Sequence, residues 1–505
     1  MKRTIAICTL LLATLSLGAR PRYITYEKYG AKGDGVTDDL PAIVAAHAAA
    51  NEKGLPVRAD SRKTYYIGGK DITAIIKTDT DFGKARFIID DTVLENIKTP
   101  VFKVVAEKEP FSLSGVKPLR KGQKNLGIKL PCRCLVEIQD KSKMDFIRKG
   151  RNLNNGSVRR DLLLVDPDGT IEEQSLPIWD FKSVSSAKAY PVDTKPLTVK
   201  GGIFTTIANQ KDSQYGYHSR GITVSRSNVL VEGVTHYVTG ELDHGAPYIG
   251  FITVSHAADV TVKDCLMTGH KTYTTIGRAG LPVEMGTYDL HANSSVSIHW
   301  INCTQTNTID DRTWWGTFTS NFCKDLRMTG CVLSRFDAHQ GVSNVTLKDC
   351  TFGHMSARAV GFGTFLIENC TMRSSCLIGL RSDYGSSWDG DIIIRNCTLK
   401  PTKDMDNLSI INGGNDGSHD FGYTCRLPYK LEIDGLVIDD SAITSKRYAG
   451  PSVFSSFGRK ADSEEISPFG TDCEVVLKNV SVASGKPLVA APNPEAFPGL
   501  NVTRR

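Results

Sequence analysis

Residues 262–265 read Val262-Lys-Asp-Cys265, and five later segments repeat this ending: Ile301-Asn-Cys303, Met328-Thr-Gly-Cys331, Leu347-Lys-Asp-Cys350, Ile367-Glu-Asn-Cys370 and Ile394-Arg-Asn-Cys397. The six cysteines lie 38, 28, 19, 20 and 27 residues apart, which are periods typical of solenoid proteins. Because one coil cannot bury its own apolar side, coils must stack, and equivalent residues then form ladders at the strand spacing of roughly 4.8 Å. The repeat therefore predicts a parallel β-helix.

The cysteines are predicted to be structural. Those at equivalent coil positions point the same way into the core, so we expect small buried hydrophobic side chains rather than disulfide partners. Metal binding by Cys132-Arg-Cys134 has little support, since no second Cys or His pair stands at finger-like spacing. The sequons Asn302-Cys-Thr and Asn396-Cys-Thr fall at repeat turns, where Asn is favoured for its backbone conformation.

Length and composition fit one long exported solenoid. The chain has 505 residues, of which 40% are hydrophobic and 45 are glycine, enough for a large core. Met1-Lys2-Arg3 precedes an apolar run from Thr4 to Leu17 and the small residues Gly18 and Ala19. This pattern predicts a cleaved secretory signal over residues 1–19, a β-helix domain over 20–505, and a secreted or periplasmic location without a lipid anchor.

The charge balance favours an acidic partner. The formal net charge is +6, and removal of the signal would leave about +4, so the mature chain carries a mild positive field. No dense Lys/Arg run or basic helix appears, which argues against a nucleic-acid partner. We therefore expect a monomer with an acidic partner.

The segment from Tyr29 to Ile67 predicts a cap for one end of the solenoid. Tyr29-Gly-Ala-Lys-Gly-Asp-Gly-Val-Thr-Asp-Asp39 is a glycine-rich turn, with Asp38 or Asp39 as N-cap of an alanine-rich helix that ends near Glu52. Residues 54–58 and 64–67 then read as short strands. A terminal coil exposes its apolar interior, and a helix placed there covers it.

Residues 29–39, with the helix and strands that follow, resemble the N-terminal signature of the pectate lyase and polygalacturonase superfamily. The resemblance covers about forty residues, and the downstream repeats agree with it in kind. It implies an all-β fold: a right-handed single-stranded parallel β-helix with an N-terminal capping helix. That superfamily includes polysaccharide lyases, glycoside hydrolases and glycan-binding surface proteins, so the fold alone does not give the reaction.

The coil pattern is interrupted between about Phe111 and Lys195. Residues 135–138 and 162–165 look like antiparallel strands, and Asp168-Gly169 is a hairpin signal. We expect a β-rich insertion packed on the solenoid. Its basic residues are interpreted as a solvated face: Arg148, Lys149, Arg151, Arg159 and Arg160.

Candidate site residues follow from the ladder. Counting back eleven or twelve residues from the first five ladder cysteines gives one column: Thr253, His291, Thr319, His339 and Arg358. The register of this column depends on loop lengths that vary between coils. Polar and aromatic side chains are dense around it: Tyr288, Asn293, Arg312, Trp314, Trp315, Asp337, Arg381, Tyr384 and Trp388. Earlier coils add His244, His270, Lys271, Tyr273 and Arg278.

These residue types suit β-elimination at a uronate. That reaction needs a base for the C5 proton, a group that neutralises the carboxylate and an acid for the leaving oxygen. We assign His339 or His291 as base and Tyr288 as acid. Arg358 would neutralise the carboxylate together with Asn293 or Arg312. Asp337 would orient the imidazole of His339, Trp314 and Trp315 would stack on sugar rings, and Arg381 and Tyr384 would bind substrate.

Three alternatives remain open at this stage. Asn307-Thr-Ile-Asp-Asp311 faintly resembles the acidic motif of polygalacturonases, which are inverting hydrolases, but no Gly-His-Gly motif and no later Arg-x-Lys accompany it. A calcium-dependent lyase would draw its ligands from four carboxylates, Asp289, Asp310, Asp311 and Asp337, although no compact aspartate loop supports it and no cofactor is assigned. A non-catalytic protein would use the same face only to hold a glycan.

Overall fold

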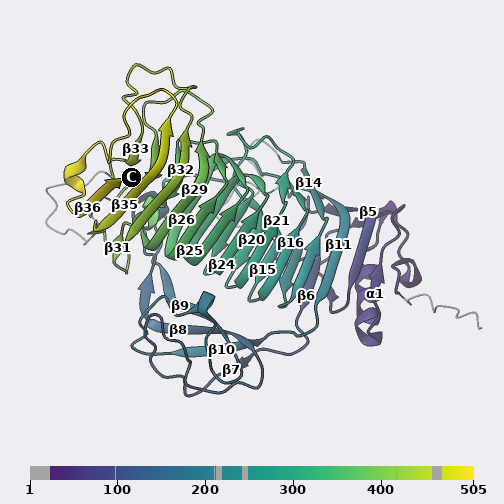
Figure 1. Cartoon of the computed structure of the whole chain (residues 1–505). Coiled ribbons are helices and arrows are strands. Elements are labelled where there is room, and N and C mark those ends of the chain that lie inside the picture. Colours follow the sequence, from purple (N-terminus) through teal and green to yellow (C-terminus); the bar gives the residue numbers. More distant parts are fainter. Residues whose placement is uncertain are drawn as a thin grey trace, which may run out of the picture.

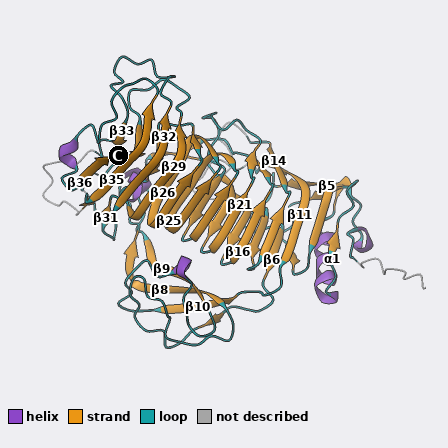
Figure 2. Cartoon of the chain, in the orientation of Figure 1, coloured by secondary structure: helices purple, strands orange, loops and turns teal. Residues whose placement is uncertain are grey.

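The chain forms a parallel β-helix. A computed structural model describes residues 23–96, 98–209, 211, 219–241, 248–415, 417, 419–457 and 469–505. Within these residues, 28 strands form one continuous sheet that winds along the axis of the molecule (Figure 1). Strands dominate the described residues, where helix occurs only in short segments (Figure 2). The predicted fold class is confirmed.

Each coil contributes strands to three faces, which we call A, B and C. Face A contains β4 (Ala74–Ile76), β6 (Phe102–Val105), β12 (Ile222–Ser225), β15 (Ile249–Ser255), β20 (Tyr288–Asn293), β23 (Phe318–Asn321), the middle of β25 (Val332–Lys348) and β26 (Thr351–Glu368), β28 (Cys376–Leu380), β30 (Ser409–Asn412) and β33 (Ser452–Phe454). Face B contains β2 (Val57–Arg58), the first halves of β5 (Thr80–Asp90) and β11 (Leu197–Ile207), β13 (Val229–Glu232), β16 (Ala258–Lys263), β21 (Val296–Ile301), β24 (Lys324–Thr329), the ends of β25 and β26, β29 (Trp388–Leu399), β32 (Lys430–Ile438), β35 (Cys473–Val482) and β36 (Leu500–Arg504). Face C contains β1 (Asp34–Asp38), β3 (Thr64–Ile67), the second halves of β5 and β11, β14 (Thr235–Thr239), β17 (Leu266–Met267), β22 (Thr304–Gln305), the starts of β25 and β26, β27 (Thr371–Met372) and the ends of β29, β32 and β35.

The repeated Asp, Asn or Gly before each ladder cysteine makes the corner between faces B and C. These residues adopt positive φ, as at Asp264 (52°), Asn302 (51°) and Gly330 (66°), a conformation that Asn, Asp and Gly tolerate best. Successive side chains also bond along the axis, because Asn302 Nδ2 donates to Asp264 Oδ1 at 3.1 Å. The sequon asparagine therefore has a structural position in a stacked turn.

The ladder cysteines point into the core, as the repeat predicts. All six are buried, and every cysteine in the described residues is a free thiol. Cys397 stacks in register with Leu436, which in turn stacks on Val480. The position thus takes any compact apolar side chain that fills the corner.

The N-terminal coil is covered by α1 (Leu40–Lys53), which lies beside the first strands in Figure 1. Its buried side includes Leu40, Ile43 and Ala46. Asp39 occupies the N-cap position, but its carboxylate accepts from the Lys32 and Gly33 amides at 2.6 and 3.0 Å and so holds the glycine-rich turn. The Asp38 carboxylate accepts from the Leu40 amide instead, at 3.1 Å.

Residues 106–196 leave the solenoid after β6 and return at β11, and we call them the insertion. A four-stranded antiparallel sheet forms its body, from β7 (Phe111–Ser112), β8 (Cys134–Asp145), β9 (Ser157–Val165) and β10 (Ser186–Pro191). Figure 1 shows it suspended below the coils. A buried ion pair joins the two bodies, with Lys324 Nζ 2.6 Å from Asp161 Oδ1. Burial raises the pKa of Asp161 although Lys324 acts to lower it, and removing either partner would leave the other charge buried without compensation.

Small elements complete the chain. Two short pairings lie outside the main sheet, β18 (Tyr273–Ile276) with β19 (Pro282–Met285) and β31 (Cys425–Arg426) with β34 (Phe469–Gly470). The 3-10 turns are η1 (Glu27–Tyr29), η2 (Gly150–Asn152), η3 (Glu173–Ser175), η4 (Ser382–Tyr384) and η5 (Pro494–Ala496). In the described part of the chain, no helix combines the length and hydropathy that a membrane crossing requires. The predicted signal lies outside the described residues.

Candidate functional site

One row of outward side chains runs along face A across most of the coils. We call it the outer row: Lys103, Thr223, Thr253, His291, Thr319, Asp337, Arg358, Gly379 and Asn412. The residues on either side of the row in each strand point inward, as Leu290 and Ala292 do beside His291. The predicted column therefore lies in this row at Thr253, His291, Thr319 and Arg358.

His339 does not lie in the outer row. The pairing of β23 with β25 shifts between Ser320 opposite Ala338 and Asn321 opposite Gln340, so Asp337 takes the row position beside Thr319. His339 follows two residues later in the strand and projects from the same side. The column prediction was wrong here because β25 carries an irregularity that loop-length counting cannot detect.

The imidazole of His339 is half-buried and fixed by two polar neighbours. Its Nδ1 lies 2.7 Å from the amide oxygen of Asn321, and its Nε2 lies 3.4 Å from the Tyr384 hydroxyl. An amide oxygen only accepts, so Nδ1 carries the hydrogen and the lone pair of Nε2 accepts from the Tyr384 hydroxyl. Burial, followed by the charge of Arg381, lowers the pKa of His339 to about 3. The ring is therefore neutral at pH 7 and able to accept a proton at Nε2.

His291 is a second neutral imidazole on the same face. Burial lowers its pKa to about 4. Both ring nitrogens are shielded from solvent and have no hydrogen-bond partner among the described residues. The neighbouring coil approaches closely, since a Cβ on Gly250 would lie 2.9 Å from the Cβ of His291. His291 stands three coils from Arg358, whereas His339 stands on the adjacent coil.

Asp337 is a fully buried hub of charge. Its Oδ2 accepts from Arg335 Nη2 at 2.6 Å and from the Tyr288 hydroxyl at 3.2 Å, and Arg381 Nη1 donates to both carboxylate oxygens at 3.0–3.1 Å. Burial alone would raise the pKa of Asp337, but the two arginines outweigh it and hold the pKa below its ordinary value. Asn321, not Asp337, orients His339, and that part of the sequence interpretation was wrong.

Three other predicted site residues, Tyr288, Arg381 and Tyr384, lie in or next to the Asp337 hub. Tyr288 is buried, and burial raises its pKa, so its hydroxyl is a donor to Asp337 rather than an exposed acid. Arg381 is committed to Asp337 and to Asp383, which Arg148 of the insertion also contacts at 3.0 Å. Tyr384 is wholly buried and cannot contact a substrate, so its predicted role in substrate binding was wrong. These residues lie beneath the candidate site.

Arg358 is a cation of the outer row that lacks a carboxylate partner among the described residues. Its Nε donates to the Met355 carbonyl at 3.0 Å, and no carboxylate in the described residues lies within ion-pair distance. The guanidinium extends over Gly379 of the next coil, where a Cβ would lie 2.2 Å from Arg358 Nη1. Only glycine leaves room for it there. A half-buried guanidinium held this way is suited to an incoming carboxylate.

The remaining predicted residues surround this centre. Trp314 and Trp315 are both half-buried and lie in the loop between β22 and β23 rather than within a strand. Trp315 stacks under Arg335, whose guanidinium carbon is 5.2 Å from the ring centroid. Arg312 of the same loop is exposed, and Asn293 is half-buried at the end of β20. His244 lies outside the described residues.

The carboxylates considered as calcium ligands do not gather. Asp310 pairs with Arg373 at 2.6 Å, and Asp311 accepts from Thr313 at 2.8 Å. Asp337 is held by its arginines and Asp289 by two histidines. In the residues that the structure describes, no group of three or more His, Cys, Asp or Glu side chains is arranged so that it could hold a metal ion. The four carboxylates serve the protein's own ion pairs and turns.

Comparison with known proteins bears on the fold. No protein-family model and no curated protein matches the sequence. The tailspike protein gp49 from Pseudomonas phage LKA1 matches with a TM-score of 0.53 and 15% identity, over 95% of this chain and 84% of the tailspike. Tailspike gp61 of Pseudomonas phage phi297 matches with a TM-score of 0.50 and 12% identity, over 92% and 82%. The chain shares the β-helix fold of these tailspikes. The pectate lyase resemblance of residues 29–39 stays a prediction.

A buried histidine network lies at the corner between faces C and A. The sequence indicates His270 and Asp289 separately but does not predict that they are in contact. Asp289 bridges two imidazoles, with its Oδ2 2.6 Å from His236 Nδ1 and its Oδ1 2.9 Å from His270 Nε2. His270 Nδ1 contacts Glu241 at 3.0 Å. The pKa of His270 is lowered by burial but raised more strongly by Glu241 and Asp289, and reaches about 10. His270 is thus a buried imidazolium at neutral pH.

This network predicts a pH-dependent stability. An unfolded histidine titrates near pH 6.5, so the charge of His270 contributes stability that is fully present below about pH 6.5 and is lost as pH rises toward about 10. We expect the stability lost in a His270→Gln variant to shrink over this range. Urea unfolding of the wild type and of the His270→Gln variant near pH 6.5 and near pH 10 measures this change. A difference in unfolding free energy between the two proteins that stays constant or grows with pH would contradict a charged His270.

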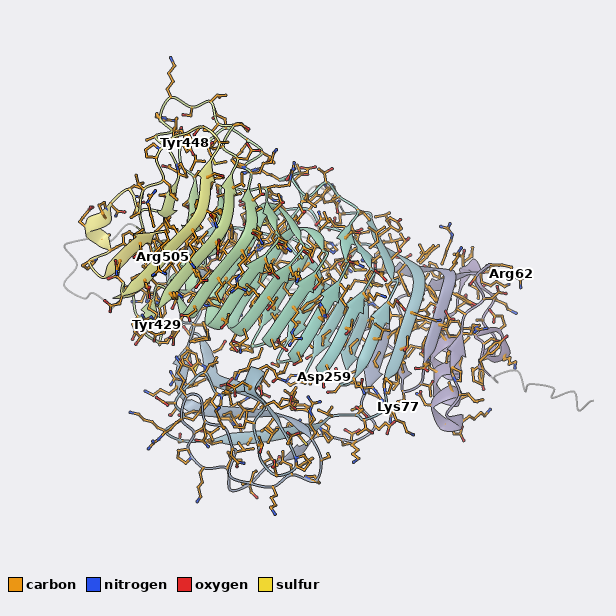
Figure 3. The ribbon with its side chains drawn as sticks, in the orientation of Figure 1. Arg62, Lys77, Asp259, Tyr429, Tyr448 and Arg505 are labelled. Carbon is orange, nitrogen blue, oxygen red and sulfur yellow. The ribbon has the colours of Figure 1, made fainter. Side chains whose placement is uncertain are left out.

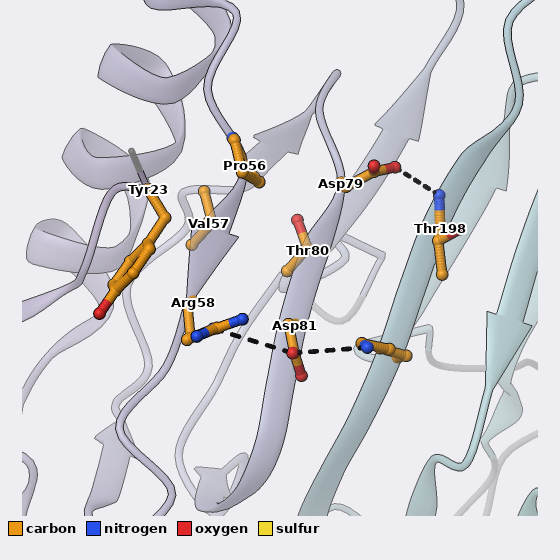
Figure 4. A pocket seen from close by; sticks show the side chains of 9 residues that line it. Tyr23, Pro56, Val57, Arg58, Asp79, Thr80, Asp81 and Thr198 are labelled. Carbon is orange, nitrogen blue, oxygen red and sulfur yellow. Dashed lines mark hydrogen bonds and ion pairs between the residues drawn. The ribbon is translucent and has the colours of Figure 1, made fainter. Parts of the chain in front are cut away.

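Cavities lie at both ends of the outer row. One of about 500 Å³ includes Lys103 of the row, and another of about 480 Å³ includes Asn412. A third, of about 270 Å³, lies on face B of the first coils (Figure 4). There Asp81 lies 3.9 Å from Arg58 and 3.6 Å from Lys200, so the charges largely cancel. The first two cavities each include a residue of the outer row, and the third does not.

Proposed function

We propose that the chain is a secreted, monomeric polysaccharide lyase that cleaves a uronic-acid-containing polysaccharide by β-elimination on face A. The observation that carries the proposal is the presence, on the adjacent strands β25 and β26, of a neutral imidazole, His339, and a guanidinium without a carboxylate partner, Arg358. They project from adjacent coils on the same side of the sheet. A base and a carboxylate-neutralising cation are what β-elimination demands.

The proposed chemistry uses each group at a stated atom. Arg358 binds the uronate carboxylate and stabilises the negative charge that develops when C5 loses its proton. His339 Nε2 accepts that proton, while Asn321 holds Nδ1–H in place. The C4–O bond then breaks, a C4–C5 double bond forms, and the imidazolium returns its proton to the leaving oxygen. The buried position of Tyr288 removes it from this last role.

The state of the carboxylates favours elimination over hydrolysis. An inverting hydrolase needs a carboxylic acid with a raised pKa and a second, free carboxylate. Asp337 is held ionised by Arg335 and Arg381, and two histidines likewise outweigh burial and lower the pKa of Asp289. Arginine pairs also lower the pKa of Asp383 despite its burial. None of these three carboxylates is suited to protonate a leaving group.

Ultraviolet absorbance tests the proposal. The purified mature protein is incubated with polygalacturonate, alginate and chondroitin sulfate, with and without a chelator, and absorbance of the unsaturated uronate is followed. A rise on one polymer that persists with chelator is expected. New reducing ends without a rise would replace the lyase by a hydrolase, and saturable binding without either signal would replace it by a glycan-binding protein.

The pH profile identifies the base. Because burial lowers the pKa of His339 to about 3, its neutral form should persist well below pH 6.5. We expect kcat/KM to stay within about twofold from pH 7 to pH 5, where an ordinary histidine would lose most of its free base. Initial rates across this range, with tryptophan fluorescence to confirm folding, measure it. A decline centred near pH 6.5 would exclude His339 as the base.

A further inference from the structure

The cavity at the N-terminal end of face A is lined by lysines. Lys77, Lys103 and Lys108 border it, together with the hydroxyls of Ser225 and Ser227. It lies between the first coils and the start and end of the insertion, which contributes Pro110 and Tyr190. Figure 3 places Lys77 on the side of the solenoid that faces the insertion. We call this the lysine cavity.

The charge in this cavity is not balanced by the protein. None of the three lysines has a carboxylate within 4.0 Å among the described residues, although half-exposed lysines elsewhere do, as Lys348 does with Glu368 at 3.1 Å. Glu109 is the one carboxylate among the lining residues. Three ammonium groups around a volume of about 500 Å³ leave a positive hollow suited to an anion.

The lysine cavity is aligned with the candidate site. Lys103 stands in the outer row, in register with Thr223 and, through Thr253, with His291. Five strand steps separate β6 from β25, which carries His339, or about 24 Å at the spacing of a parallel sheet. A single sugar cannot span this distance, but an extended chain lying across the strands can.

We propose that the lysine cavity is a remote subsite that binds a carboxylate or sulfate of an extended acidic polysaccharide, another part of which lies at His339 and Arg358. This inference rests on the proposed function, and it adds that the substrate must be a polymer long enough to reach both the cavity and His339. Contacts between the polysaccharide and the cavity lysines hold the polysaccharide along the outer row. Long substrates therefore bind with an affinity that short substrates lack.

Binding measurements test the subsite apart from catalysis. The double variant Lys77→Ala/Lys103→Ala is compared with wild type and with Lys348→Ala, which removes a lysine from face B. Equilibrium binding is measured for polygalacturonate, chondroitin sulfate and neutral dextran at low and raised salt. Two charged contacts predict about a fivefold to tenfold weaker binding of the anionic polymer at low salt and a weaker salt dependence. The Lys348→Ala variant should bind like wild type.

The outcomes separate the subsite from the lyase. Weakened binding of polygalacturonate identifies a carboxylate subsite, and weakened binding of chondroitin sulfate alone identifies a sulfate subsite. If the double variant loses binding although wild type cleaves no polymer, the subsite holds and the lyase proposal fails. Unchanged binding of both polymers, or an equal loss in Lys348→Ala, overturns the subsite even if the wild type is a lyase.

Discussion

Replacing His339 with alanine is expected to lower kcat/KM on the cleaved polymer by about 10²–10⁴-fold, the usual contribution of a positioned general base. The imidazole is neutral, with Nδ1 held by Asn321 and Nε2 3.4 Å from the Tyr384 hydroxyl, and alanine leaves nothing at this position to accept the C5 proton. Initial rates of ultraviolet absorbance measure the loss. Substrate binding should change little, because Arg358 and the outer row remain.

His299 provides the matched control. It is half-buried on β21 of face B, where its Nε2 lies 2.9 Å from Thr329 Oγ1. His299→Ala removes the same side chain from another face and should keep wild-type kcat/KM. If the His339→Ala variant is folded by urea unfolding and retains more than about a tenth of the activity, the base lies elsewhere, and His291→Ala becomes the next variant to assay.

Replacing Asp337 with alanine is expected to reduce the free energy of unfolding by about 3–5 kcal/mol, as breaking a buried ion pair does. The carboxylate is inaccessible to solvent and holds Arg335 and Arg381, whose side chains are 5% and 14% exposed. Without it, Arg335 has no carboxylate partner among the described residues, and Arg381 keeps only Asp383. Urea denaturation monitored by circular dichroism gives the difference.

An exposed ion pair provides the control for the Asp337→Ala prediction. Asp439 lies 2.9 Å from Lys400, which is half exposed on the solenoid surface. The Asp439→Ala variant should lose less than about 1 kcal/mol, because water screens that pair. Equal losses in the two variants would mean that Asp337 is not the buried hub described above. A small loss in Asp337→Ala, with activity intact, would also separate the hub from the site.

The coil architecture could be predicted because its signal is local and repeated. The residue before each ladder cysteine must tolerate positive φ, and the cysteine must fill a small corner, so both appear at every turn in the sequence. The same holds for the cap, where the glycine-rich turn and the helix are contiguous. The direction of each coil's interior then follows from strand alternation.

The site was harder to predict because its contacts depend on register and on distant pairs. The shift in β25 moved Asp337 into the outer row and gave His339 a partner, Asn321, eighteen residues away. His236 meets Asp289 across 53 residues, with nothing in the local sequence to announce it. Spacing counts cannot resolve such contacts, since one slipped residue changes every pairing beyond it.

The insertion shows the same limit. Its basic residues were interpreted as a solvated face, but Arg159 contacts Asp145 at 2.8–2.9 Å, and Arg148 reaches Asp383 of the solenoid. An arginine run in a sequence does not reveal whether acids lie opposite in the fold. Here the charges join the insertion to the coil that carries Arg381, and so contribute to the support of the site.

The mass of the cleavage products tests the central claim most directly. Mass spectrometry of oligosaccharides released by the wild-type protein distinguishes the two ways of breaking a uronate glycoside. β-Elimination on face A predicts that the new ends are unsaturated uronates, each lighter by one water than the corresponding hydrolysis product. Products that have gained water would contradict the account, since they would require a carboxylate acid that His339 and Arg358 do not supply.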